Sequence, residues 1–382
     1  MIDFTLTDEQ EELRRTVERF ARETVAPVIG DLYERGEFPY EIVKGMGAMG
    51  LFGLPFPERD GGMGGDYFAL CLALEELARV DSSVAVTLEA AVSLGSMPVH
   101  RFGTDEQRAE LLPSLLSGER IAAFGLTEPG GGTDVPGGMR TTARLDGDAW
   151  VIDGSKCFIT NSGTDVTAFV TVTALTGDDE ISTIIVPNGT PGFTVGRKYS
   201  KVGWSASDTH ELAFDGVRVP AANLLGERGR GYAQFLRILD EGRIAIAALS
   251  VGLAQGCVDE CLRYVRERSA FGREIGRYQA IQFKIADMEA RAHTARLAYY
   301  AAAALLLAGK PFKKEAAIAK LVASNAAMDN AREATQIFGG YGFMNEYPVG
   351  RFYRDAKILE VGEGTSEVQR MLIARALGLP AS

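Results

Sequence analysis

The sequence predicts an α+β protein built from three consecutive parts. We expect an N-terminal helical domain over residues 1–120, a middle antiparallel β-barrel domain over residues 121–225, and a C-terminal four-helix bundle domain over residues 226–382. Two capping boxes, each followed by apolar residues at helical spacing, indicate the first part. Short β-branched runs between turn dipeptides indicate the second, and long apolar stripes at helical spacing indicate the third.

The N-terminal part carries signals for helix starts. Thr7-Asp8-Glu9-Gln10 and Thr104-Asp105-Glu106-Gln107 both have the capping-box pattern, in which the first and fourth residues satisfy each other's backbone N–H groups. Apolar residues follow each box at helical spacing, and Tyr67–Val80 and Ser83–Leu94 share this spacing. We therefore expect several helices before residue 120.

The segment Gly45–Gly50 matches the pattern G-x-G-x-x-G of dinucleotide-binding loops. Such a loop follows a strand and opens a helix. Here the preceding residues have a helical pattern, and Leu54-Pro55-Phe56-Pro57 cannot form the crossover helix. We interpret these glycines as a helix end packed closely against its neighbours.

Between residues 120 and 225 short runs rich in β-branched residues replace the helical spacing. Runs of this kind, separated by turn residues, are typical of a small antiparallel sheet. We expect strands around Trp150-Val151-Ile152, Phe169–Val172, Ile181–Val186 and Glu211–Phe214, with turns at Asp146-Gly147 and Asp153-Gly154.

From about Gly229 the sequence returns to helical spacing in long segments. Ile281, Ile285, Met288 and Ala292 fall on one stripe of such a segment. Long helices with apolar stripes pack as antiparallel bundles, which predicts the C-terminal bundle.

Charge and hydropathy limit the class of partner. Of 382 residues, 51 are acidic and 40 basic, which gives a formal net charge of −11 and a pI near 5.0. Because an acidic surface repels nucleic acid and anionic membranes, we expect neither as the main partner. The stretch from Met1 to Leu6 shows no signal peptide, and the apolar stretches Ile244–Val258 and Leu297–Ala308 are shorter than the ~20 residues that span a bilayer. We expect a soluble cytoplasmic protein.

No residue pattern favours a metal site. The histidines lie far apart, and Glu289 with His293 has neither the spacing nor the second pair of a di-iron bundle. The cysteines show no two pairs at metal-ligand spacing, so we interpret them as buried thiols in a reducing compartment. They are Cys71, Cys157, Cys257 and Cys261.

Two segments in the predicted β domain have the chemistry of a ligand site. In Gly125–Asp134 a Gly-rich turn follows a strand and presents backbone N–H groups and Thr hydroxyls, so it can approach a flat polar ring or a phosphate closely. In Lys156–Asn161, Phe158 and Thr160 share a strand face, where they can stack on a ring and hydrogen-bond to it. Taken singly, an ordinary Gly-rich loop and a core-filling pair explain these residues equally well.

Two further segments lie in the predicted bundle. Arg266–Gly272, with Gln279 and the later Gln336–Gly342, combines arginine with glycine-rich turns, which suits a pyrophosphate. In Glu360–Glu367, glycines flank Glu363 and leave its carboxylate open to close approach by a ligand. A solvated arginine and a plain loop glutamate are the alternatives for these segments.

Together the four segments resemble the acyl-CoA dehydrogenase family, and the similarity covers essentially the whole chain. Gly125–Asp134 fits the family pattern G-[LIVM]-[ST]-E-x-x-G-G-[ST]-D, and Arg351–Lys357 followed by Glu363-Gly364-Thr365 is a second specific match. The resemblance implies FAD as cofactor, an acyl-CoA as substrate and desaturation of its α,β-bond, in fatty acid or branched-chain amino acid degradation. It also implies a homotetramer and an electron-transfer flavoprotein as electron acceptor.

The resemblance further implies a role for each site residue, with Glu363 as the catalytic base. The residues that would bind FAD are Phe124, Leu126, Thr127, Thr133, Phe158, Thr160, Arg268, Phe271, Gln279, Gln336, Gly340, Thr365 and Glu367. Those from Arg268 to Gly340 would hold its adenine-diphosphate half, partly from a neighbouring subunit. The residues that would bind the substrate are Thr133, Asp240, Arg243 and Gly364.

A carboxylate suits the implied chemistry. The α-proton of a thioester is weakly acidic, so the site must polarise the carbonyl group with aimed donors. In this family the donors are the backbone N–H of the base and a ribityl hydroxyl of FAD. Glu363 would take the α-proton while the β-hydrogen leaves as hydride to the flavin. We expect a bound acyl chain to dry the site and raise the pKa of Glu363.

The sequence departs from the family at positions near this site. Gly362 stands where many members have an aromatic residue, which predicts extra room beside the thioester or a looser base loop. Gly242 stands where some members carry the base, and it cannot act as one. Ala270 and Phe158 stand where many members have Thr and Trp, and each predicts a lost contact to FAD.

The segments Leu239–Ile244 and Gly309–Phe312 look most like the short- and branched-short-chain members. The main alternative is an acyl-CoA oxidase or a flavin monooxygenase-like member of the same fold, which the oxygen reactivity of the reduced flavin would distinguish. A non-enzymatic member is a further alternative, and it would lack bound FAD or a usable base.

Overall fold

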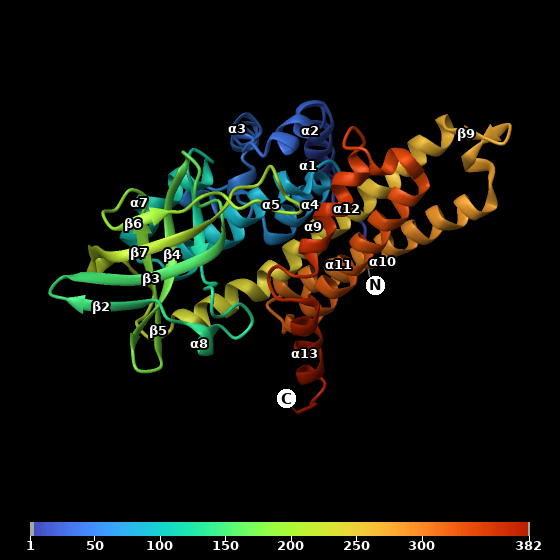
Figure 1. The fold of residues 1–382 in the computed structure, drawn as a ribbon. Coiled ribbons are helices and arrows are strands. Elements are labelled where there is room, and N and C mark those ends of the chain that lie inside the picture. Colours follow the sequence, from blue (N-terminus) through green and yellow to red (C-terminus); the bar gives the residue numbers. More distant parts are fainter. Residues whose placement is uncertain (1–3, 381–382) are drawn as a thin grey trace.

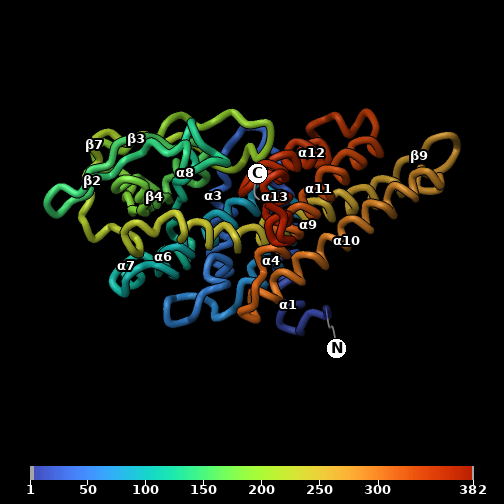
Figure 2. The backbone as a smooth tube through the Cα atoms, turned by 90° about the horizontal axis from the view of Figure 1, so that it is seen from below, coloured from blue at the N-terminus to red at the C-terminus, as the bar shows by residue number. Residues whose placement is uncertain are grey.

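The protein has a helical N-terminal part, a β-sheet middle part and a helical C-terminal part, as Figure 1 shows. This computed structural model describes residues 4–380. Residues 1–3, which belong to the N-terminal stretch without a predicted signal peptide, lie outside the described residues. The sheet lies at one end of an elongated molecule and the hairpin β9–β10 at the other (Figures 1 and 2).

Helices form the N-terminal part, as predicted. Both predicted capping boxes are present, since the side chain of Thr7 accepts from the backbone of Gln10 and the reverse bond also forms, and Thr104 pairs with Gln107 in the same way. The elements are α1 (Asp8–Phe20), η1 (Ala21–Val25), α2 (Ala26–Arg35), α3 (Tyr40–Ala48), η2 (Leu51–Gly53), η3 (Glu58–Asp60), α4 (Tyr67–Ala78), α5 (Ser82–Glu89), η4 (Ala90–Ser96), α6 (Met97–Phe102) and α7 (Asp105–Leu116).

The G-x-G-x-x-G match is a packed helix end, as interpreted from the sequence. α3 ends at Ala48, directly within this match. A Cβ on Gly47 would stand 2.7 Å from the carbonyl oxygen of Ser117, and one on Gly45 would stand 2.9 Å from the ring of Phe20. Close packing therefore accounts for these glycines.

The middle part is an open sheet and not the predicted closed barrel. Its strand order is β6-β7-β3-β2-β4-β5-β8, with β1 paired to β4, so the path has two free ends. It is not wholly antiparallel either, because β4 pairs in parallel with β1 and β2. The elements are β1 (Ile121–Gly125), α8 (Val135–Gly138), β2 (Thr142–Asp146), β3 (Ala149–Thr160), β4 (Thr167–Gly177), β5 (Glu180–Pro187), β6 (Phe193–Val195), β7 (Thr209–Pro220), η5 (Ala221–Asn223) and β8 (Leu224–Leu225).

The two predicted turn dipeptides have different structures. Asp146-Gly147 joins β2 to β3 as predicted, with Gly147 at a φ of 67°. Asp153-Gly154 is not a turn, because it lies inside β3 where the register with β7 shifts between Ile152 and Gly154. Gly154 has a φ of 145° and a Cβ there would stand 2.6 Å from Thr141, so this dipeptide forms a β-bulge.

The C-terminal part contains three long helices, α9, α10 and α11, that pack against one another, and a shorter α12 that packs against α9 and α11. This arrangement agrees with the predicted helical bundle. The elements are α9 (Gly231–Glu267), β9 (Ser269–Ala270), β10 (Arg273–Glu274), η6 (Ile275–Arg277), α10 (Gln279–Leu307), α11 (Lys313–Phe338), η7 (Gly339–Phe343), α12 (Pro348–Leu359) and α13 (Ser366–Ala376).

Two large apolar cores hold these parts together. One core is continuous from the N-terminal helices through α9, α10, α11 and α12, and it also takes in Phe124 and Phe169 from the sheet. The other core lies within the sheet itself and includes Trp150, Ile152 and Phe214. The N-terminal and C-terminal helices therefore form one packed body, and β1 and β4 attach the sheet to it.

Two helical segments, Ser82–Phe102 and Gly231–Glu267, are long and apolar enough to cross a membrane by length and composition. The expectation that no apolar stretch reaches this length is therefore wrong. However, 94% and 83% of their most apolar windows are buried inside the protein, as in core helices. The described residues contain no cluster of three or more potential metal ligands. All four cysteines are buried, as predicted.

Candidate active site

Glu363 lies in the loop between α12 and α13, with its carboxyl group directed into the protein. Its φ is 52° and that of Gly364 is 92°, both in the left-handed region. For a glutamate this conformation costs of order 1–3 kcal/mol, so surrounding contacts must hold it. Lys320 Nζ and Gln369 Nε2 both donate to the carbonyl oxygen of Gly364 at 2.8 Å. Among residues 4–380, Glu363 Oε2 is buried and has no hydrogen-bond partner.

Helix α9 passes the carboxyl group of Glu363 at Gly242. A Cβ on this glycine would stand 2.6 Å from Glu363 Oε2, which is closer than non-bonded atoms approach. Gly242 therefore provides the space that the carboxyl group of Glu363 occupies.

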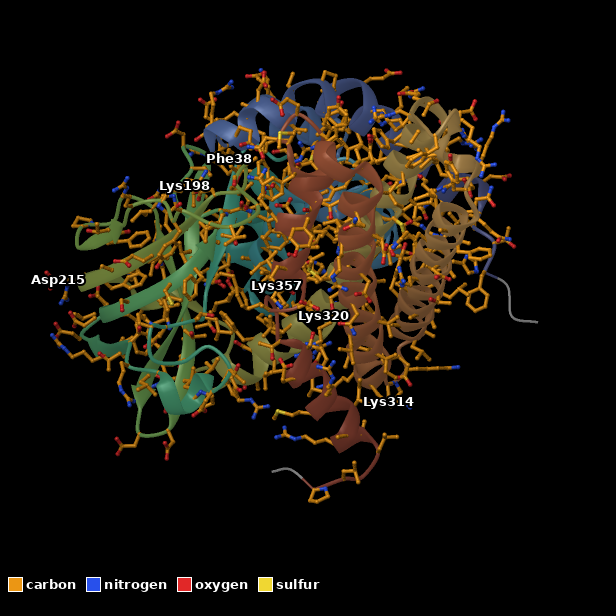
Figure 3. The ribbon with its side chains drawn as sticks, turned by 45° about the vertical axis from the view of Figure 1, so that its right-hand side comes forward. Phe38, Lys198, Asp215, Lys314, Lys320 and Lys357 are labelled. Carbon is orange, nitrogen blue, oxygen red and sulfur yellow. The ribbon has the colours of Figure 1, made fainter. Side chains whose placement is uncertain are left out.

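Buried charges surround this carboxyl group. Burial raises the pKa of Glu363, while the nearby cations Lys320 and Arg243 act in the opposite direction. Burial lowers the pKa of Lys320 to about 8. Lys320 lies on α11 inside the C-terminal part, as Figure 3 shows. These groups place a titratable base and a titratable cation in one dry region.

The predicted substrate-binding residues of α9 adjoin Gly242. Asp240 and Arg243 are buried and form an ion pair, and Asp240 Oδ2 also lies 2.6 Å from Lys313 Nζ. Arg243 Nε is buried without a partner among the described residues. The structure thus brings Asp240, Arg243, Glu363 and Gly364 into one region.

The Gly-rich loop after β1 is fixed to β3 at several points. Lys156 is fully buried and donates to Glu128 Oε1 at 2.7 Å and to the carbonyl oxygen of Leu126 at 3.2 Å. The backbone N–H of Cys157 donates to the carbonyl oxygen of Thr127 at 2.9 Å. These contacts leave Leu126 and Thr127 half-buried and Thr133 exposed.

Phe158 and Thr160 lie at the end of β3. Phe158 is 66% exposed although Cys157 and Ile159 beside it are buried. The strand is irregular here, because Phe158 has a φ of 61° and the register with β7 shifts between Lys156 and Ile159. Phe158 and Thr160 are both less buried than Ile159 between them, but the regular alternation on which the predicted shared face rests is absent here.

Aromatic stacking joins this part of the sheet to α9. The rings of Phe124, the predicted flavin-lining residue on β1, and Phe235 on α9 stack with centroids 3.8 Å apart. At the end of β3, Asn161 Nδ2 donates to the carbonyl oxygen of Thr87 on α5 at 3.0 Å. The sheet therefore meets the helical body on the side that carries Gly242 and Glu363.

Thr365 and Glu367, also predicted to contact FAD, follow Glu363 closely. The side chain of Thr365 caps α13 by accepting from the backbone of Val368 at 3.3 Å. Glu367 is exposed. Both therefore stand at the N-terminus of α13, beside the base loop.

The remaining predicted cofactor residues lie at the other end of the molecule. Phe271 is 97% exposed in the hairpin β9–β10, at the far end of the bundle from the sheet (Figures 1 and 2). Arg268 stacks over the ring of Tyr341 at 5.7 Å, which places it beside η7. Arg268, Gln279, Gln336 and Gly340 are exposed as well. Within one chain the structure does not bring this group together with Phe158.

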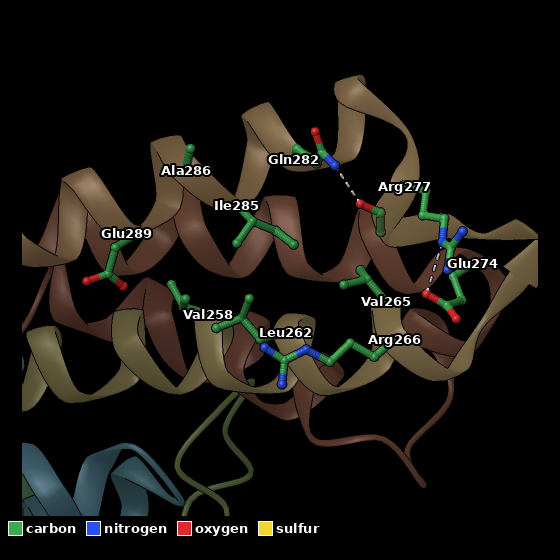
Figure 4. Close-up of a pocket in the computed structure, with 11 residues that line it drawn as sticks. Val258, Leu262, Val265, Arg266, Glu274, Arg277, Gln282, Ile285, Ala286 and Glu289 are labelled. Carbon is green, nitrogen blue, oxygen red and sulfur yellow. Dashed lines mark hydrogen bonds and ion pairs between the residues drawn. The ribbon is translucent and has the colours of Figure 1, made fainter.

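A cleft of about 550 Å³ lies next to this second group, between α9 and α10 (Figure 4). Its walls include the apolar side chains of Val258, Leu262, Val265 and Ile285. None of the predicted site residues lines it.

The first group fits the flat ring system of FAD. A ring as exposed as that of Phe158 offers a stacking surface, and the half-buried hydroxyls of Thr127 and Thr160 can donate or accept at a ring edge. At the bundle end, the exposed guanidinium of Arg268 suits a pyrophosphate.

Three charged residues of this region were not predicted from the sequence: Glu89, Glu128 and Lys320. Each is buried in the structure. Glu89 had a detectable signal, since it is the single acid in the apolar segment Ser83–Leu94. Lys320 and Glu128 had no such signal in the sequence, because their partners Gly364 and Lys156 lie 44 and 28 residues away in the chain.

A helical body and a sheet meet beside the buried carboxyl group of Glu363, and a carboxyl group in such a place is the kind of residue that acts as a general base. Comparison with known proteins makes this specific. The acyl-CoA dehydrogenase N-terminal, middle and C-terminal domain models match residues 7–119, 123–217 and 229–378. The chain therefore belongs to the acyl-CoA dehydrogenase family, whose members are FAD-dependent oxidoreductases acting on acyl-CoA.

Individual relatives agree over the full length. The chain is 48% identical to the probable acyl-CoA dehydrogenase YngJ of Bacillus subtilis, over 98% of this chain and 100% of the relative. Its fold matches butyryl-CoA dehydrogenase from Megasphaera elsdenii with a TM-score of 0.95 and 42% identity, over 98% and 100% of the two chains. It also matches a solved structure concerned with the electron transferring flavoprotein of Acidaminococcus fermentans, with a TM-score of 0.96 and 41% identity over 98% and 99%.

Proposed function

We propose that this chain desaturates a short-chain acyl-CoA between its α and β carbons, with Glu363 as the catalytic base. The buried carboxyl group of Glu363 carries this assignment, because its Oε2 has no hydrogen-bond partner among residues 4–380. Such a group is costly unless a ligand or a proton satisfies it. Burial also raises its pKa, which makes it a better base near neutral pH.

The chain's own groups account for removal of the α-proton. The backbone N–H of Glu363 donates to no backbone acceptor among the described residues, so it is free to polarise the thioester carbonyl. The carboxylate of Glu363 then accepts the α-proton, and Arg243 and Lys320 favour its ionised form beforehand. FAD, when bound, supplies the acceptor for the β-hydrogen, which leaves as a hydride.

The two separate groups of cofactor residues support a homo-oligomer, which we propose to be a tetramer. The group at the sheet would hold the flavin half of FAD, and the exposed group at the hairpin would hold the adenine-diphosphate half of a neighbouring subunit's FAD. The exposed ring of Phe271 and the apolar cleft beside it favour contact with another subunit. Closed symmetric assembly would complete every site in the same way.

Substrate and acceptor are proposed from similar proteins. A matching structure is a butyryl-CoA dehydrogenase, which supports a short acyl chain. A second match concerns an electron transferring flavoprotein, which supports such a protein as the electron acceptor. We also propose the cytoplasm as the location, on the expectation from the sequence.

Anaerobic bleaching of the flavin spectrum tests the proposal. Butyryl-CoA and isobutyryl-CoA are added in turn to the wild type, to Glu363→Gln and to the exposed control Glu346→Gln. We expect the wild type and the control to bleach with one of the thioesters. Glu363→Gln should bind the thioester but bleach at least about 10²-fold more slowly, because general-base catalysis contributes 10²–10⁴-fold.

The outcomes separate the parts of the proposal. A Glu363→Gln variant that bleaches at the wild-type rate contradicts the role of this residue. A wild type that carries FAD but bleaches with neither thioester contradicts the substrate class. Rapid reoxidation of the bleached enzyme by oxygen favours the acyl-CoA oxidase alternative.

A further inference from the structure

Glu89 is a buried acid that the proposed reaction leaves unused. It is the last residue of α5, directly before the π-helix η4, and it has no exposed surface. Neither carboxyl oxygen has a hydrogen-bond donor among residues 4–380. A carboxylate without any donor in such a place is strongly disfavoured, so the neutral form is expected.

The carboxyl groups of Glu89 and Glu363 converge on Gly242. From the position that a Cβ of this glycine would occupy, Glu363 Oε2 lies at 2.6 Å and Glu89 Oε1 at 3.9 Å. Two ionised carboxylates this close together in a dry site repel strongly. A proton held by one of them turns the repulsion into a hydrogen bond.

The surrounding charges decide which residue holds this proton. Tyr67, Cys71 and Ser93, which are all neutral at moderate pH, lie on the Glu89 side. The cations Arg243 and Lys320 lie on the Glu363 side. The acid next to Gly242 on α9, Glu241, points elsewhere and pairs with Arg101 at 2.6 Å. The proton therefore belongs on Glu89 and the negative charge on Glu363.

The pKa directions agree with this division. Burial, and then the charge of Glu363, raises the pKa of Glu89 well above its usual value. Burial also raises the pKa of Glu363, but a hydrogen bond donated by a protonated Glu89 would lower it again. These directions fit a protonated Glu89 beside an ionised Glu363.

We propose that Glu89 is a positioning residue for Glu363: in the substrate-free site its neutral carboxyl group donates a hydrogen bond to the carboxylate of Glu363 and holds it against Gly242. An entering acyl chain displaces this contact and frees the carboxylate to meet the α-carbon. Glu89 keeps its proton throughout, and Glu363 takes the α-proton, so no proton is lost or gained between them. The inference rests on the proposed role of Glu363 as the base.

The pH dependence of kcat/KM in two variants tests this role, because kcat/KM reports the free enzyme. Glu89→Gln keeps a neutral donor of similar shape, so its acid limb should remain where the wild type has it. Glu89→Leu removes the donor, so its acid limb should move to higher pH by about one unit or more, a tenfold loss of the ionised base on that limb. A Glu89→Leu limb that coincides with the wild-type limb overturns the proposal.

A second readout needs no turnover. The infrared spectrum of the free protein at pH about 9 should contain a protonated carboxyl band from Glu89, since Glu76 and Asp355, whose pKa values are about 7 and about 6, are ionised there. The band should disappear in Glu89→Gln and persist in Glu363→Gln. A band that persists in Glu89→Gln shows that Glu89 does not carry the proton. This result is independent of whether Glu363 is the base, which the bleaching experiment decides.

Discussion

Lys156 and Glu128 form a fully enclosed ion pair, with Lys156 Nζ 2.7 Å from Glu128 Oε1 and both side chains almost without exposed surface. The pair joins β3 to the Gly-rich loop after β1, and Glu128 also accepts from the backbone of Arg140 and Thr141. It therefore shapes the loop that we propose binds the flavin. Burial lowers the pKa of Lys156 to about 8, against the opposing effect of Glu128.

We predict that Lys156→Met destabilises the protein and weakens FAD binding together. Removing Lys156 leaves the Glu128 carboxylate buried with its backbone donors but without its counter-charge, and breaking a buried pair in this way costs about 3–5 kcal/mol. Thermal unfolding of the apoprotein and titration with FAD measure the two effects. The double variant Lys156→Met with Glu128→Gln removes both charges and should recover part of the stability. A single variant as stable as the wild type would show that the pair does not hold the loop.

Gly242→Ala should separate stability from activity. Alanine in place of glycine favours a helix interior by about 0.5–1 kcal/mol, so α9 itself is not weakened. Its Cβ would stand 2.6 Å from Glu363 Oε2, however, and the carboxyl group must move. A displacement of about 1 Å at a reacting group costs up to about 10²-fold in rate, and we expect a loss of that order in kcat.

Gly362→Ala is the matched control for this prediction. A Cβ at Gly362, next to the base, would meet the carbonyl oxygen of Ile358 at 3.4 Å, an ordinary contact. Steady-state kinetics should therefore show a much smaller loss than for Gly242→Ala. Equal losses in both variants would mean that the loop tolerates no added methyl group, and that the space opposite Glu363 is not the cause.

Lys320 makes the free energy of unfolding depend on pH, and a variant of this residue can isolate its contribution. Its pKa is about 8 when folded, because of burial, and 10.5 is its ordinary value. Between these two pH values the unfolded chain holds a proton that the folded chain has released, so this residue makes the free energy of unfolding rise with pH. Lys320→Met should lack this rise, whereas the exposed control Lys310→Met should keep it. Chemical unfolding of the apoprotein at several pH values between 8 and 10.5 measures the difference.

The same variant should also affect catalysis. Lys320 lowers the pKa of Glu363 by its charge, so its loss should move the acid limb of kcat/KM to higher pH. An unchanged limb in Lys320→Met would show that its hydrogen bond to Gly364, and not its charge, is what matters at the base loop.

Local signals in the sequence were sufficient for the parts of the fold that depend on near neighbours. Thr7 and Thr104 cap their helices through residues three positions away. The prolines that follow Gly45–Gly50 exclude the helix of a dinucleotide-binding loop, so the packed helix end could be predicted as well. The order of the strands depends on contacts between residues that lie far apart in the sequence. Local patterns do not reveal these contacts, and the predicted β-barrel is wrong for this reason. The dipeptide Asp153-Gly154 is compatible with a turn or with a bulge, and only the pairing of β3 with β7 distinguishes the two structures.

The same difference between local and distant contacts applies to the site residues. Glu363 and the Gly-rich loop were found because their motifs are contiguous in the sequence, and the roles assigned to them remain predictions. Glu89 and Lys320 were missed because helix packing, not sequence spacing, brings them to Glu363. An acidic residue in an otherwise apolar helix indicates that its side chain contacts a distant residue, but the sequence does not show which residue that is.

Mixed oligomers should show that one site draws on two subunits. A chain with Glu363→Gln lacks the proposed base, and a chain with Arg268→Ala lacks a proposed FAD contact at the opposite end of the molecule, so each alone should be nearly inactive. If Arg268 serves a neighbour, a mixed pair contains one site with both residues intact, and statistical mixing leaves about a quarter of all sites intact. The activity of the co-expressed chains should therefore exceed that of either parent.

Pairing Glu363→Gln with Phe158→Ala is the control, because both positions belong to the same half of the site and every mixed site then carries one defect. Recovery with Arg268→Ala but not with Phe158→Ala supports a site shared between subunits, and equal behaviour of the two pairs contradicts it.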